Sequence, residues 1–521
     1  MIIPDILAWS ARRWPENECI IDIDPDNNMR HSLTYRQFDD RVNMVANALL
    51  GAGIKKGDRV LHFMKNRAEW LETYFGIIRI GAIVVPLNFR FTSADVQHAA
   101  DVIKPSLVMI DSDLVNIIDP VLSTLKTVKS VILIGEGLNE GMKSYEDFIS
   151  ESSVKPPEIE VSEKDDLGIY FTSGTTGKPK AILYSHGNLY AVAVSNGFTI
   201  PLPPNPNSII YCPLYHTATL FFWLPCLFAG GRGTILRQFS LHNLLKTIEQ
   251  ERGTEVNIPM PHCVDYISAQ ERGEINVSDY DLSSWCYINT GAQPYPPSVI
   301  KDLQKLFPNV GIQHGFGISE GGGATLTLLP PDEILTKSGS VGKAAVMVDV
   351  RVADAEGKDV PTGELGELVI KSERVMKAYY GNPKATEKAI RDGWLYTGDI
   401  ARMDEDGYIY IVDRKKDVIN SGGENVYPVE VENVLMTHPK ILEVAIIGTP
   451  DEKFGERVTA VVNLKPGEEM GKEELLEWCR EKLPAYKRPR RVEFGELPKS
   501  PTNKILKPEL RMIYTGKTGA F

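Results

Sequence analysis

The sequence lacks the cysteine spacing of a zinc site or a disulfide framework. Only six of its 521 residues are cysteine, and they are scattered without a Cys-x-x-Cys pair. Isolated cysteines of this kind are typical of reduced thiols. We therefore expect a cytoplasmic protein that holds neither structural zinc nor disulfide bonds.

Long apolar runs and an excess of basic residues are missing as well. No stretch reaches the roughly 18 apolar residues that a transmembrane helix needs, and the N-terminus has no basic segment followed by an apolar core. The net charge is -12, whereas a nucleic-acid-binding protein would present a basic face. The sequence therefore predicts no transmembrane segment and no nucleic-acid partner.

The N-terminal half alternates helical and strand patterns. Thr34 and Gln37 form a capping box, which predicts that an amphipathic helix begins here and ends near Gly51 and Gly53. Apolar runs at 59–63 and 82–86 read as strands between further helices. This alternation is typical of a wound α/β layer. The inward face of the predicted helix consists of Phe38, Val42, Val45 and Leu49.

Beyond residue 342 the pattern changes to that of antiparallel strands. Valines at 346, 348, 350 and 352 alternate with polar residues, a turn follows at 355–358, and a second apolar run covers 365–370. This alternation predicts a half-buried strand pair in a small barrel. After residue 417, short strands and two helices, at 429–436 and 472–482, predict an α+β domain.

A segment rich in glycine and hydroxyl groups covers residues 170–180. It holds four Ser/Thr hydroxyls, two glycines and two lysines, a set of donors that suits a polyphosphate. The segment is not a Walker loop, because Thr172 stands where that motif has glycine and Pro179 blocks the helix that would follow. We expect a nucleoside triphosphate held in a different geometry.

Five further motifs follow in order, at 313–320, 394–399, 410–414, 421–428 and 498–504. Together with the loop, this set strongly resembles the acyl-adenylate-forming superfamily, which includes acyl-CoA synthetases, peptide-synthetase adenylation domains and luciferase. The resemblance runs from about residue 33 to residue 504. It is strongest to acid-CoA ligases, such as 4-chlorobenzoate-CoA ligase and fatty-acyl-CoA synthetases.

The resemblance implies an α/β fold with a large N-terminal AMP-binding domain, 1–413, and a small mobile α+β lid domain, 414–521. The larger domain would contain two α/β subdomains, about 1–165 and 166–330, and a small β-barrel, about 331–413. The hinge would lie near 414–417, with Lys416 at the family's hinge position.

The resemblance also implies a reaction in two steps. A carboxylate is a poor electrophile and must first be activated. Its oxygen therefore attacks the α-phosphate of ATP, which forms acyl-AMP and releases pyrophosphate. The acyl group then passes to CoA and AMP is released. The carboxylate and the phosphates of ATP are both anions, so their approach requires neutralisation by lysine, Mg²⁺ and backbone dipoles. A protein nucleophile is not required. The expected cofactors and co-substrates are ATP, Mg²⁺ and CoA.

Most of the implied site residues bind the nucleotide. Glu320 would hold Mg²⁺, Ser319 would touch phosphate, and Lys504 would bridge the carboxylate and the α-phosphate. Asp399 and Arg414 would bind the ribose, with Ile411 beside them. The β- and γ-phosphates would be cradled by Thr172, Ser173, Gly174, Thr175, Thr176, Gly177 and Lys178. The adenine would lie between Phe316, with its neighbours His314, Gly315 and Gly317, and a wall of Gly291, Ala292, Gln293 and Pro294.

The remaining implied residues serve CoA and the acid. Gly422 and Gly423 would let the pantetheine arm pass close to the backbone, and Arg90, Phe454 and Arg488 would hold the nucleotide end of CoA. The acid would be aromatic or a medium to long aliphatic chain, with room left by three glycines in 321–324. Its pocket would be lined by Tyr215, the catalytic candidate His216, Phe221 and Trp223.

Two positions depart from the family pattern, and three other functions remain open. Ala181 and Asn503 replace glycines, for which we expect altered loop geometry rather than lost activity. The enzyme alternatives are a stand-alone adenylating enzyme that loads a carrier protein and a luciferase-like enzyme. A nucleotide-binding regulatory protein is the third reading, against which the joint presence of Glu320, Asp399, Arg414 and Lys504 speaks. The sequence leaves a homodimer open and does not identify the acid.

Overall fold

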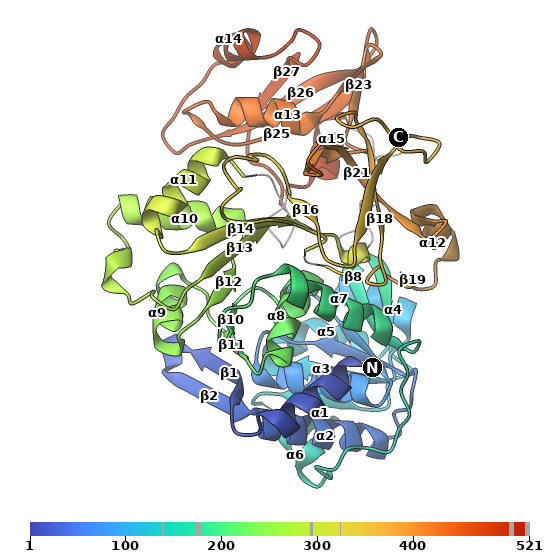
Figure 1. Ribbon diagram of the computed structural model, residues 1–521. Helices are drawn as coiled ribbons and strands as arrows, with labels where there is room; N and C mark the ends of the chain where they lie inside the picture. Colours follow the sequence, from blue (N-terminus) through green and yellow to red (C-terminus); the bar gives the residue numbers. More distant parts are fainter. Residues whose placement is uncertain (138–139, 173–178, 292–294, 324, 500–504, 516–521) are drawn as a thin grey trace. The chain divides into compact units, whose positions relative to one another are not determined.

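The computed structural model describes residues 1–137, 140–172, 179–291, 295–323, 325–499 and 505–515. The chain forms two compact units: the first comprises Met1–Val350 and Ile370–Leu395, and the second comprises Arg351–Val369 and Tyr396–Phe521. The predicted boundary between residues 413 and 414 lies within the second unit and stays a prediction. Helices and strands alternate along most of the first unit (Figure 1).

An eight-stranded sheet of the first unit runs in the order β19-β9-β8-β4-β3-β5-β6-β7. The strands from β4 to β7 in this order pair in parallel, whereas β8, β9 and β19 pair antiparallel to one another. The strands are β3 (Arg59–Phe63), β4 (Ile83–Pro86), β5 (Leu107–Asp111), β6 (Val131–Ile134), β7 (Met142–Ser144), β8 (Asp166–Thr172), β9 (Lys180–Ser185) and β19 (Ala378–Tyr379).

A nine-stranded sheet of the same unit runs in the order β16-β15-β14-β13-β12-β10-β11-β1-β2. Its central strands are parallel, so the carboxyl ends of β12, β13 and β14 share one edge of the sheet. The strands are β1 (Glu18–Asp24), β2 (Met29–Thr34), β10 (Asn207–Ile210), β11 (Arg232–Leu236), β12 (Glu255–Asn257), β13 (Tyr287–Gly291), β14 (Gly311–Phe316), β15 (Thr327–Leu329) and β16 (Lys343–Ala344).

The two sheets correct the predicted subdomain boundary at residues 165/166. Strand β1 pairs with β11, more than 200 residues later in the chain, and β8 with β9 joins the sheet of the earlier strands. The physical reason is that parallel pairing links strands through crossovers and does not follow chain order. Each sheet is therefore assembled from both of the predicted subdomains.

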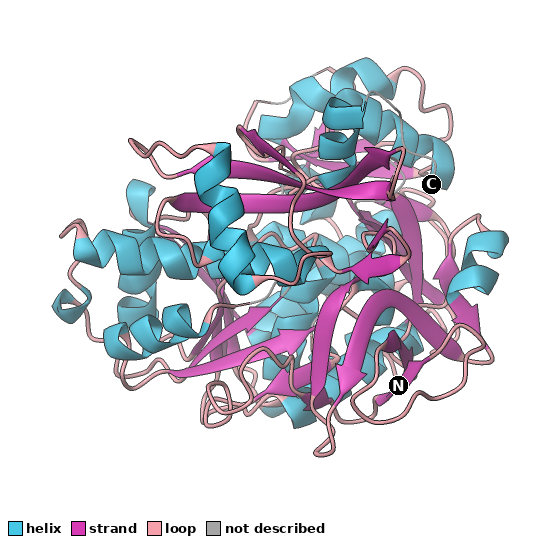
Figure 2. Ribbon diagram, turned by 90° about the horizontal axis from the view of Figure 1, so that it is seen from above, coloured by secondary structure: helices cyan, strands magenta, loops and turns pink. Residues whose placement is uncertain are grey.

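Helices of the first unit contact strands of both sheets, and Figure 2 shows helices in cyan beside strands in magenta. Helix α2 confirms the capping-box prediction: Thr34 Oγ1 accepts from the Gln37 amide at 3.2 Å, and the predicted inward face is fully buried. Helix α8 is apolar nearly all round and is buried against α7, α1, β10 and β11. The helices are α1 (Ile3–Arg13), α2 (Tyr35–Gly51), α3 (Ala68–Arg79), α4 (Ser93–Ile103), α5 (Val115–Leu122), α6 (Tyr145–Ser150), α7 (His186–Thr199), α8 (Thr217–Phe228), α9 (Leu241–Glu251), α10 (Met260–Glu271), α11 (Pro297–Leu306) and α12 (Pro383–Ala389).

The segment expected to form a small barrel contains a five-stranded sheet, in which β17 (Asp349–Ala353), β18 (Gly366–Lys371) and β21 (Trp394–Met403) are neighbours. Strands β20 (Ile390–Arg391) and β22 (Ile409–Arg414) both pair with β21. The predicted start of the first strand was wrong. Val346 and Met347 are 46% and 49% exposed in a turn, because Met347 has a φ of 64° that a strand does not accommodate.

The rest of the second unit confirms the predicted α+β pattern. Its sheet runs β24-β23-β26-β25, with β27 beside β26, and its core lies between this sheet and helices α13 and α14. A third helix, α15, was not predicted, and it packs on β25. The elements are β23 (Ile419–Ser421), β24 (Glu424–Val426), β25 (Ile441–Asp451), β26 (Gly455–Leu464), β27 (Arg491–Phe494), α13 (Pro428–Met436), α14 (Lys472–Lys482) and α15 (Lys507–Thr515).

Candidate active site

The glycine- and hydroxyl-rich loop joins two antiparallel strands. Strand β8 ends at Thr172, β9 begins at Lys180, and these two residues face each other across the hairpin. The chain therefore continues as a strand, not as the helix of a Walker loop, which confirms the sequence argument from Pro179. Ser173, Gly174, Thr175, Thr176, Gly177 and Lys178 lie outside the described residues.

Glu320 lies in a three-residue 3-10 helix, Ser319–Gly321, that follows β14. The hydroxyl of the buried Tyr184 donates to the Ser319 carbonyl and accepts from the Gly322 amide at 2.7 Å. The amide of Met376 donates to the Glu320 carbonyl at 2.8 Å. Both ends of this turn are thus fixed by hydrogen bonds from distant parts of the chain.

The Glu320 side chain accepts a hydrogen bond from Tyr379, whose hydroxyl lies 2.8 Å from Oε1. Tyr379 is 7% exposed and belongs to β19, which pairs with β9. The Lys180 ammonium lies 4.8 Å from the centre of the Tyr379 ring. Among the described residues Glu320 forms no ion pair. No sequence pattern marks Tyr379 as a site residue, because an Ala-Tyr-Tyr segment carries no recognisable functional signal.

Arg374 is a second residue that sequence reasoning missed. It is fully buried, and its guanidinium donates to the Thr325 carbonyl and to Ser195 Oγ, both at 2.8 Å, and to the Gly322 carbonyl at 3.5 Å. Burial lowers its pKa to about 10, so it stays charged at neutral pH. Carbonyl dipoles thus stabilise this cation next to the Glu320 turn.

The glycines at 321–323 correct one expectation about the acid pocket. A Cβ on Gly321 would lie 2.5 Å from Leu326, one on Gly322 would lie 2.7 Å from Val192, and one on Gly323 would lie 2.8 Å from the Thr217 backbone. The space that these glycines leave is therefore filled by the protein itself. They permit close packing rather than room for a substrate, and Ala324 lies outside the described residues.

The proposed adenine walls stand at the carboxyl ends of neighbouring parallel strands. Gly291 of β13 faces Gly315 of β14, and a Cβ on Gly291 would lie 2.4 Å from the Gly315 carbonyl oxygen. Phe316 is half-buried and flanks Gly317. His314 is buried against the Tyr295 ring at 4.5 Å, and burial lowers its pKa to about 4, so its ring is neutral. Ala292, Gln293 and Pro294 lie outside the described residues.

Residues predicted for the acid divide between the start of α8 and the core. His216 is the half-buried N-cap of α8, and its ring lies 4.7 Å from that of Tyr215. Phe221 packs edge-on against the rings of Tyr170 and Tyr184, at 5.6 Å and 5.8 Å. The predicted acid residues therefore form two groups: His216 contacts Tyr215, whereas Phe221 is fully buried in the core.

Trp223 was predicted to line the acid pocket, but it lies in the core. It is 1% exposed and packs against Phe75 and Gly233 of β11, where an added Cβ would lie 2.4 Å from the indole nitrogen. The physical reason is that α8 is apolar nearly all round. An aromatic residue on it can therefore face the core as easily as a pocket.

Arg90, predicted to hold the nucleotide end of CoA, is exposed. Its guanidinium carbon lies 5.6 Å from the centre of the Phe89 ring, and Phe89 in turn packs edge-on against Tyr215 at 5.5 Å. The guanidinium forms no ion pair with a described residue, so its charge is available to an anion.

In the second unit, the structure brings the two predicted ribose residues together. Asp399 of β21 faces Arg414 of β22, and Arg414 Nε lies 2.7 Å from Asp399 Oδ1. Asp399 is 2% exposed, whereas the Arg414 side chain is 45% exposed. Thr397 Oγ1 accepts from the Asp399 amide at 3.1 Å, which fixes the turn before the carboxylate. Ile411 lies on β22 opposite Ala401.

The predicted hinge residue Lys416 lies in the turn after β22. The Asp417 amide donates to the Arg414 carbonyl at 2.8 Å, and Asp417 pairs with Arg511 of α15 at 2.8 Å. Burial lowers the pKa of Lys416. Asp413, at the end of β22, accepts from the Val429 amide at 2.8 Å, and burial raises its pKa to about 6.

The two glycines predicted to pass pantetheine form the loop of the β23–β24 hairpin. Gly422 and Gly423 have φ values of 68° and 88°, which L-residues with side chains rarely adopt. The Gly422 amide donates to the Phe454 carbonyl at 2.8 Å, and a Cβ on Gly422 would lie 3.0 Å from the Phe454 ring. The structure therefore brings both glycines and Phe454 together.

Arg488 is a correction to the predicted CoA site. Its guanidinium donates to the carbonyls of Leu483 and Arg480, at 2.7 Å and 3.0 Å, and so caps the C-terminal end of α14. Arg490 instead lies over the Phe454 ring, with its guanidinium carbon 3.7 Å from the ring centre. Both belong to the basic segment 487–491, and only packing distinguishes them. Lys504 lies outside the described residues.

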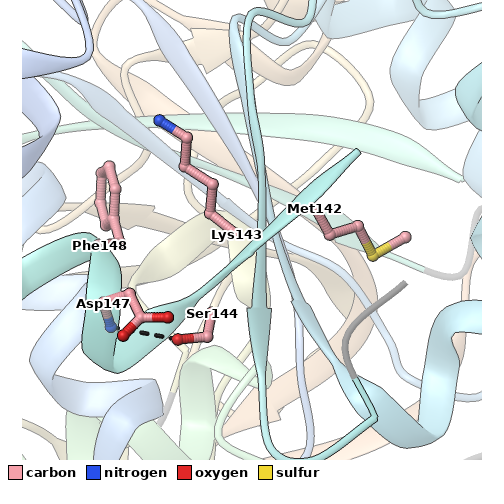
Figure 3. A pocket seen from close by; sticks show the side chains of 5 residues that line it. All are labelled: Met142, Lys143, Ser144, Asp147 and Phe148. Atoms are coloured by element: carbon pink, nitrogen blue, oxygen red, sulfur yellow. Dashed lines mark hydrogen bonds between the residues drawn. The ribbon is translucent and has the colours of Figure 1, made fainter. Parts of the chain in front are cut away.

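The described pockets do not coincide with these residues. One of about 340 Å³ lies beside β7 and α6, where Ser144 Oγ accepts from the Asp147 amide at 3.1 Å (Figure 3). Another of about 800 Å³ lies among the residues of α10, α11 and the segment between α10 and β13. Neither is lined by a predicted site residue, so the site assignment depends on the motifs and their contacts.

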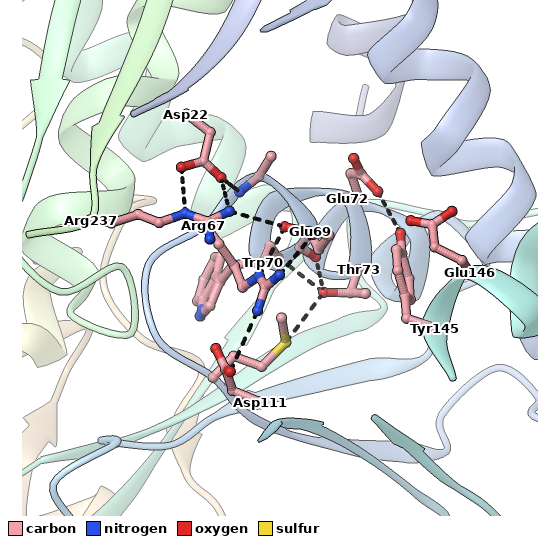
Figure 4. A network of polar contacts seen from close by, with 12 residues as sticks. Asp22, Arg67, Glu69, Trp70, Glu72, Thr73, Asp111, Tyr145, Glu146 and Arg237 are labelled. Carbon is pink, nitrogen blue, oxygen red and sulfur yellow. Dashed lines mark hydrogen bonds and ion pairs between the residues drawn. The ribbon is translucent and has the colours of Figure 1, made fainter. Parts of the chain in front are cut away.

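A network of charged side chains in the first unit also contains none of the predicted site residues (Figure 4). Asp22 of β1 accepts from Arg237 at 2.6 and 2.7 Å and from the Ala68 amide at 2.8 Å. Arg67 pairs with Glu69 at 2.9 Å and with Asp111 at 3.4 Å. This cluster links β1, α3, β5 and the end of β11, and its cations are matched by carboxylates.

The same cluster continues along α3 to a buried glutamate. Glu72 Oε2 accepts from Arg41 at 2.7 Å and from the Tyr145 hydroxyl at 2.5 Å. Burial raises the pKa of Glu72 to about 7 although Arg41 opposes this shift. All of these partners come from the protein itself, which indicates a structural role.

The Glu320 turn fits a magnesium ion that is shared with a nucleotide. No three His, Cys, Asp or Glu side chains group into a metal site within the described ranges. Mg²⁺ is commonly held by one or two carboxylates together with substrate phosphates. A single half-buried carboxylate without a cationic partner suits that arrangement.

Comparison with known proteins covers nearly the whole chain. Residues 7–380 match the model of the AMP-binding enzyme family, and residues 430–504 match that of the AMP-binding enzyme C-terminal domain. The chain is 36% identical over 484 residues to a feruloyl-CoA synthase of Amycolatopsis sp, covering 92% of this chain and 94% of the relative. It is 34% identical over 502 residues to the long-chain-fatty-acid-CoA ligase FadD13 of Mycobacterium tuberculosis, covering 95% of each.

Solved structures agree with these matches. A Mycobacterium tuberculosis fatty acyl CoA synthetase superposes with a TM-score of 0.78 at 31% identity, covering 99% of this chain and 98% of the other. ATP-bound MatB from Rhodopseudomonas palustris superposes with a TM-score of 0.87 at 27% identity, covering 100% of both chains. None of the helices in the described residues has the length and apolar content to cross a bilayer.

Proposed function

This chain belongs to the AMP-binding enzyme family, and we propose that it is an ATP- and Mg²⁺-dependent acid-CoA ligase that works through an acyl-adenylate. One observation carries this conclusion. Both family models match within one chain, and the chain aligns with 94% or more of the length of a feruloyl-CoA synthase and of a long-chain-fatty-acid-CoA ligase. The acid is an aromatic or a medium to long aliphatic carboxylic acid.

In the first half-reaction, the carboxylate attacks the α-phosphate and pyrophosphate leaves. Thr172 and the loop that follows it hold the β- and γ-phosphates, Ser319 touches phosphate, and Glu320 holds the magnesium ion. Mg²⁺, when bound with ATP, neutralises charge on the phosphates. Lys504 offsets the charge of the two anions that meet at phosphorus, so the barrier falls mainly through electrostatic preorganisation.

We assign the nucleoside to motif residues of both units. Gly291 and Phe316 flank the adenine, and Asp399 accepts hydrogen bonds from the ribose hydroxyls. The short contact between Arg414 and Asp399 holds this carboxylate in one orientation. Asp399 is thus ready to accept before the nucleotide arrives.

In the second half-reaction, the thiol of CoA attacks the acyl carbon of the adenylate, the bond to phosphate breaks and AMP leaves. Gly422 and Gly423 let the pantetheine arm approach the backbone, and Phe454 lies beside them. Arg90, which has no ion-pair partner in the described part of the chain, offers its cation to a phosphate of CoA. Arg490, rather than Arg488, accompanies Phe454.

Because different residues near the C-terminus serve the two steps, we expect the segment after about residue 414 to rotate between them, about a hinge at 414–417. Proline at Lys416 would restrict φ in that turn. Lys416→Pro should leave acid-dependent pyrophosphate release nearly intact and sharply slow transfer to CoA. Transfer at the wild-type rate by the folded variant would contradict this hinge position.

The reaction is tested by measuring AMP release over a panel of carboxylic acids with and without CoA. Aromatic and medium to long aliphatic acids are included, together with a phosphopantetheinylated carrier protein as a second acceptor. We expect CoA to accelerate AMP release and an acyl-CoA to form. Acceleration by the carrier protein alone would indicate a carrier-loading enzyme, and no pyrophosphate release with any acid would contradict an adenylating enzyme.

Other attributes follow from the same proposal. All six cysteines are free and no pair of them is bridged, which supports a reducing compartment such as the cytoplasm. A homodimer stays a prediction, to be checked by light scattering.

A further inference from the structure

Tyr379 links the two motifs that would bind the phosphates. Its hydroxyl donates to Glu320 Oε1 at 2.8 Å, and its ring lies 4.8 Å from the ammonium of Lys180. Lys180 is the first residue of β9, directly opposite Thr172 at the end of the phosphate loop. One side chain thus contacts both the predicted magnesium carboxylate and the strand that closes the loop.

The position of Tyr379 is set by the backbone. Residues Ala378 and Tyr379 pair with Leu183 and Ile182 of β9, and the Lys377 and Tyr380 amides donate to the carbonyls of Leu183 and Ala181 at 2.9 and 2.8 Å. The ring is 7% exposed. Strand pairing fixes the direction of the Cα–Cβ bond, and burial of the ring restricts its rotamers, so the hydroxyl is a well-positioned donor.

The same segment of the chain also holds the turn that carries Glu320. The Met376 amide donates to the Glu320 carbonyl at 2.8 Å, and Arg374 donates to the Gly322 and Thr325 carbonyls. Residues 374–376 therefore hold the main chain at Glu320 and after it, while the Tyr379 hydroxyl holds the Glu320 side chain.

A hydrogen bond to one carboxylate oxygen restricts the rotation of the whole group. Without this bond, Glu320 would sample several rotamers, and binding a cation would cost the entropy of selecting one of them. Outer hydrogen bonds of this type orient metal-binding carboxylates, and removing them typically weakens metal affinity about 10- to 100-fold.

We propose that Tyr379 is a positioning residue that orients Glu320 for the magnesium ion of the bound nucleotide. This inference rests on the proposed function, in which Glu320 holds that ion. Tyr379 does not touch the reacting atoms. It acts through the carboxylate, and its ring places Lys180 at the end of the phosphate loop.

The test is direct metal binding by the full-length protein, without turnover. The protein is saturated with α,β-methylene-ATP, which cannot release pyrophosphate, and Mn²⁺ is titrated as the probe by electron paramagnetic resonance. Tyr379→Phe removes only the hydroxyl and keeps the ring beside Lys180. We expect this substitution to lower the affinity for Mn²⁺ about 10- to 100-fold. The affinity for the metal-free nucleotide should stay unchanged.

Two variants serve as controls. Tyr380→Phe removes the same hydroxyl from the next residue, whose side chain packs against the apolar cluster of the eight-stranded sheet, and it should bind Mn²⁺ as the wild type does. Glu320→Gln removes the carboxylate itself and should weaken Mn²⁺ at least as much as Tyr379→Phe. Tyr379→His retains a ring with a donor and should recover part of the affinity.

The outcomes separate the inference from the proposed function. Loss in Glu320→Gln with wild-type affinity in Tyr379→Phe would overturn the role of Tyr379 alone. Wild-type affinity in both variants would overturn Glu320 as the magnesium residue and the inference with it. Equal weakening of the metal-free nucleotide and of Mn²⁺ in Tyr379→Phe, together with a lower unfolding midpoint, would show a purely structural role.

Discussion

Two polar regions of the first unit differ in how their charged side chains are paired. In the cluster of Figure 4, Asp22 is neutralised by Arg237 and Arg67 by Glu69, so the buried charges are balanced within the protein. At the Glu320 turn, the carboxylate meets a phenol, and the neighbouring cation Arg374 meets carbonyl groups. The first arrangement stabilises the fold, whereas the second leaves the Glu320 carboxylate without an ion pair among the described residues, so a cation bound with a nucleotide can pair with it.

The largest effect on stability is expected from breaking the balanced cluster. Asp22→Asn keeps the shape but leaves Arg237 without its main partner, which should lower the free energy of unfolding by about 3 to 5 kcal/mol. Urea unfolding measures this change. Acyl-CoA formation per folded molecule should stay near the wild-type rate, and a selective loss of activity in a stable variant would place the cluster in the site after all.

An exposed pair provides the matched control. Asp281 pairs with Arg252 at 2.8 Å, with side chains 59% and 51% exposed. Asp281→Asn makes the same chemical change, and a solvent-exposed pair contributes little to stability, so the loss should be much smaller than in Asp22→Asn. A similar loss in both variants would remove the distinction between buried and exposed pairs.

The next largest effect is expected on the rate of adenylation when the charge of Lys504 is removed. Lys504→Ala should cost about 3 kcal/mol or more of transition-state stabilisation in adenylation, which is more than 100-fold in rate. Thioester formation from supplied acyl-adenylate should survive. Lys499, which pairs with Glu443 at 2.7 Å, is the control, and Lys499→Ala should retain both steps. Equal loss of both steps in Lys504→Ala would indicate a structural lysine.

Glu255 represents a third arrangement, because this buried carboxyl group forms no ion pair with a described residue. Burial raises its pKa to about 7 from 4.5, against hydrogen bonds from Cys226 and Ser208. The folded protein therefore binds a proton that the unfolded chain releases, and stability should fall as pH rises from about 4.5 to 7.

Glu255→Gln removes this titration. The stability of the variant relative to wild type should rise between pH 4.5 and 7 by up to about 3 kcal/mol, measured by thermal or urea unfolding over that range. Glu158→Gln, at an exposed glutamate, should show no such change. A flat difference for Glu255→Gln would mean that Glu255 is ionised in the folded protein at pH 5.

The smallest effect is expected on ATP binding when Asp399 is replaced. Asp399 forms an ion pair with Arg414, like the pairs of the charged cluster, but it is also the predicted acceptor for the ribose hydroxyls. Asp399→Ala should weaken ATP binding by about 1.5 to 3 kcal/mol, the range for hydrogen bonds to charged groups. Isothermal titration with ATP measures the loss. An unchanged ATP affinity in the folded variant would make the pair structural, like those of Figure 4.

Features that depend on local hydrogen bonding could be read from the sequence. The capping box of α2 involves residues three apart, and Pro179 excludes a helix by its own geometry, so both predictions were confirmed. The motif residues Asp399 and Arg414 were placed together by strand pairing, as the resemblance implied. The family and the reaction followed from motifs of this kind.

Features that depend on packing between distant segments could not be read in the same way. Trp223 was assigned to the pocket, but its surroundings are set by β11 and α3. Arg488 and Arg490 are two residues apart, and only the fold shows which of them lies against Phe454. Tyr379 reaches Glu320 from 59 residues further along the chain, so no local pattern announces it.

The division of the chain limits how the enzyme can be dissected. The polypeptide leaves the first unit at Val350, returns at Ile370 and leaves again after Leu395, so it passes between the units three times. A fragment that stops at residue 350 would lack β19, which completes one edge of the eight-stranded sheet. Expression of either unit alone therefore calls for a spliced or circularly permuted gene, and a single cut at the 413/414 boundary would leave 351–369 attached to the wrong piece.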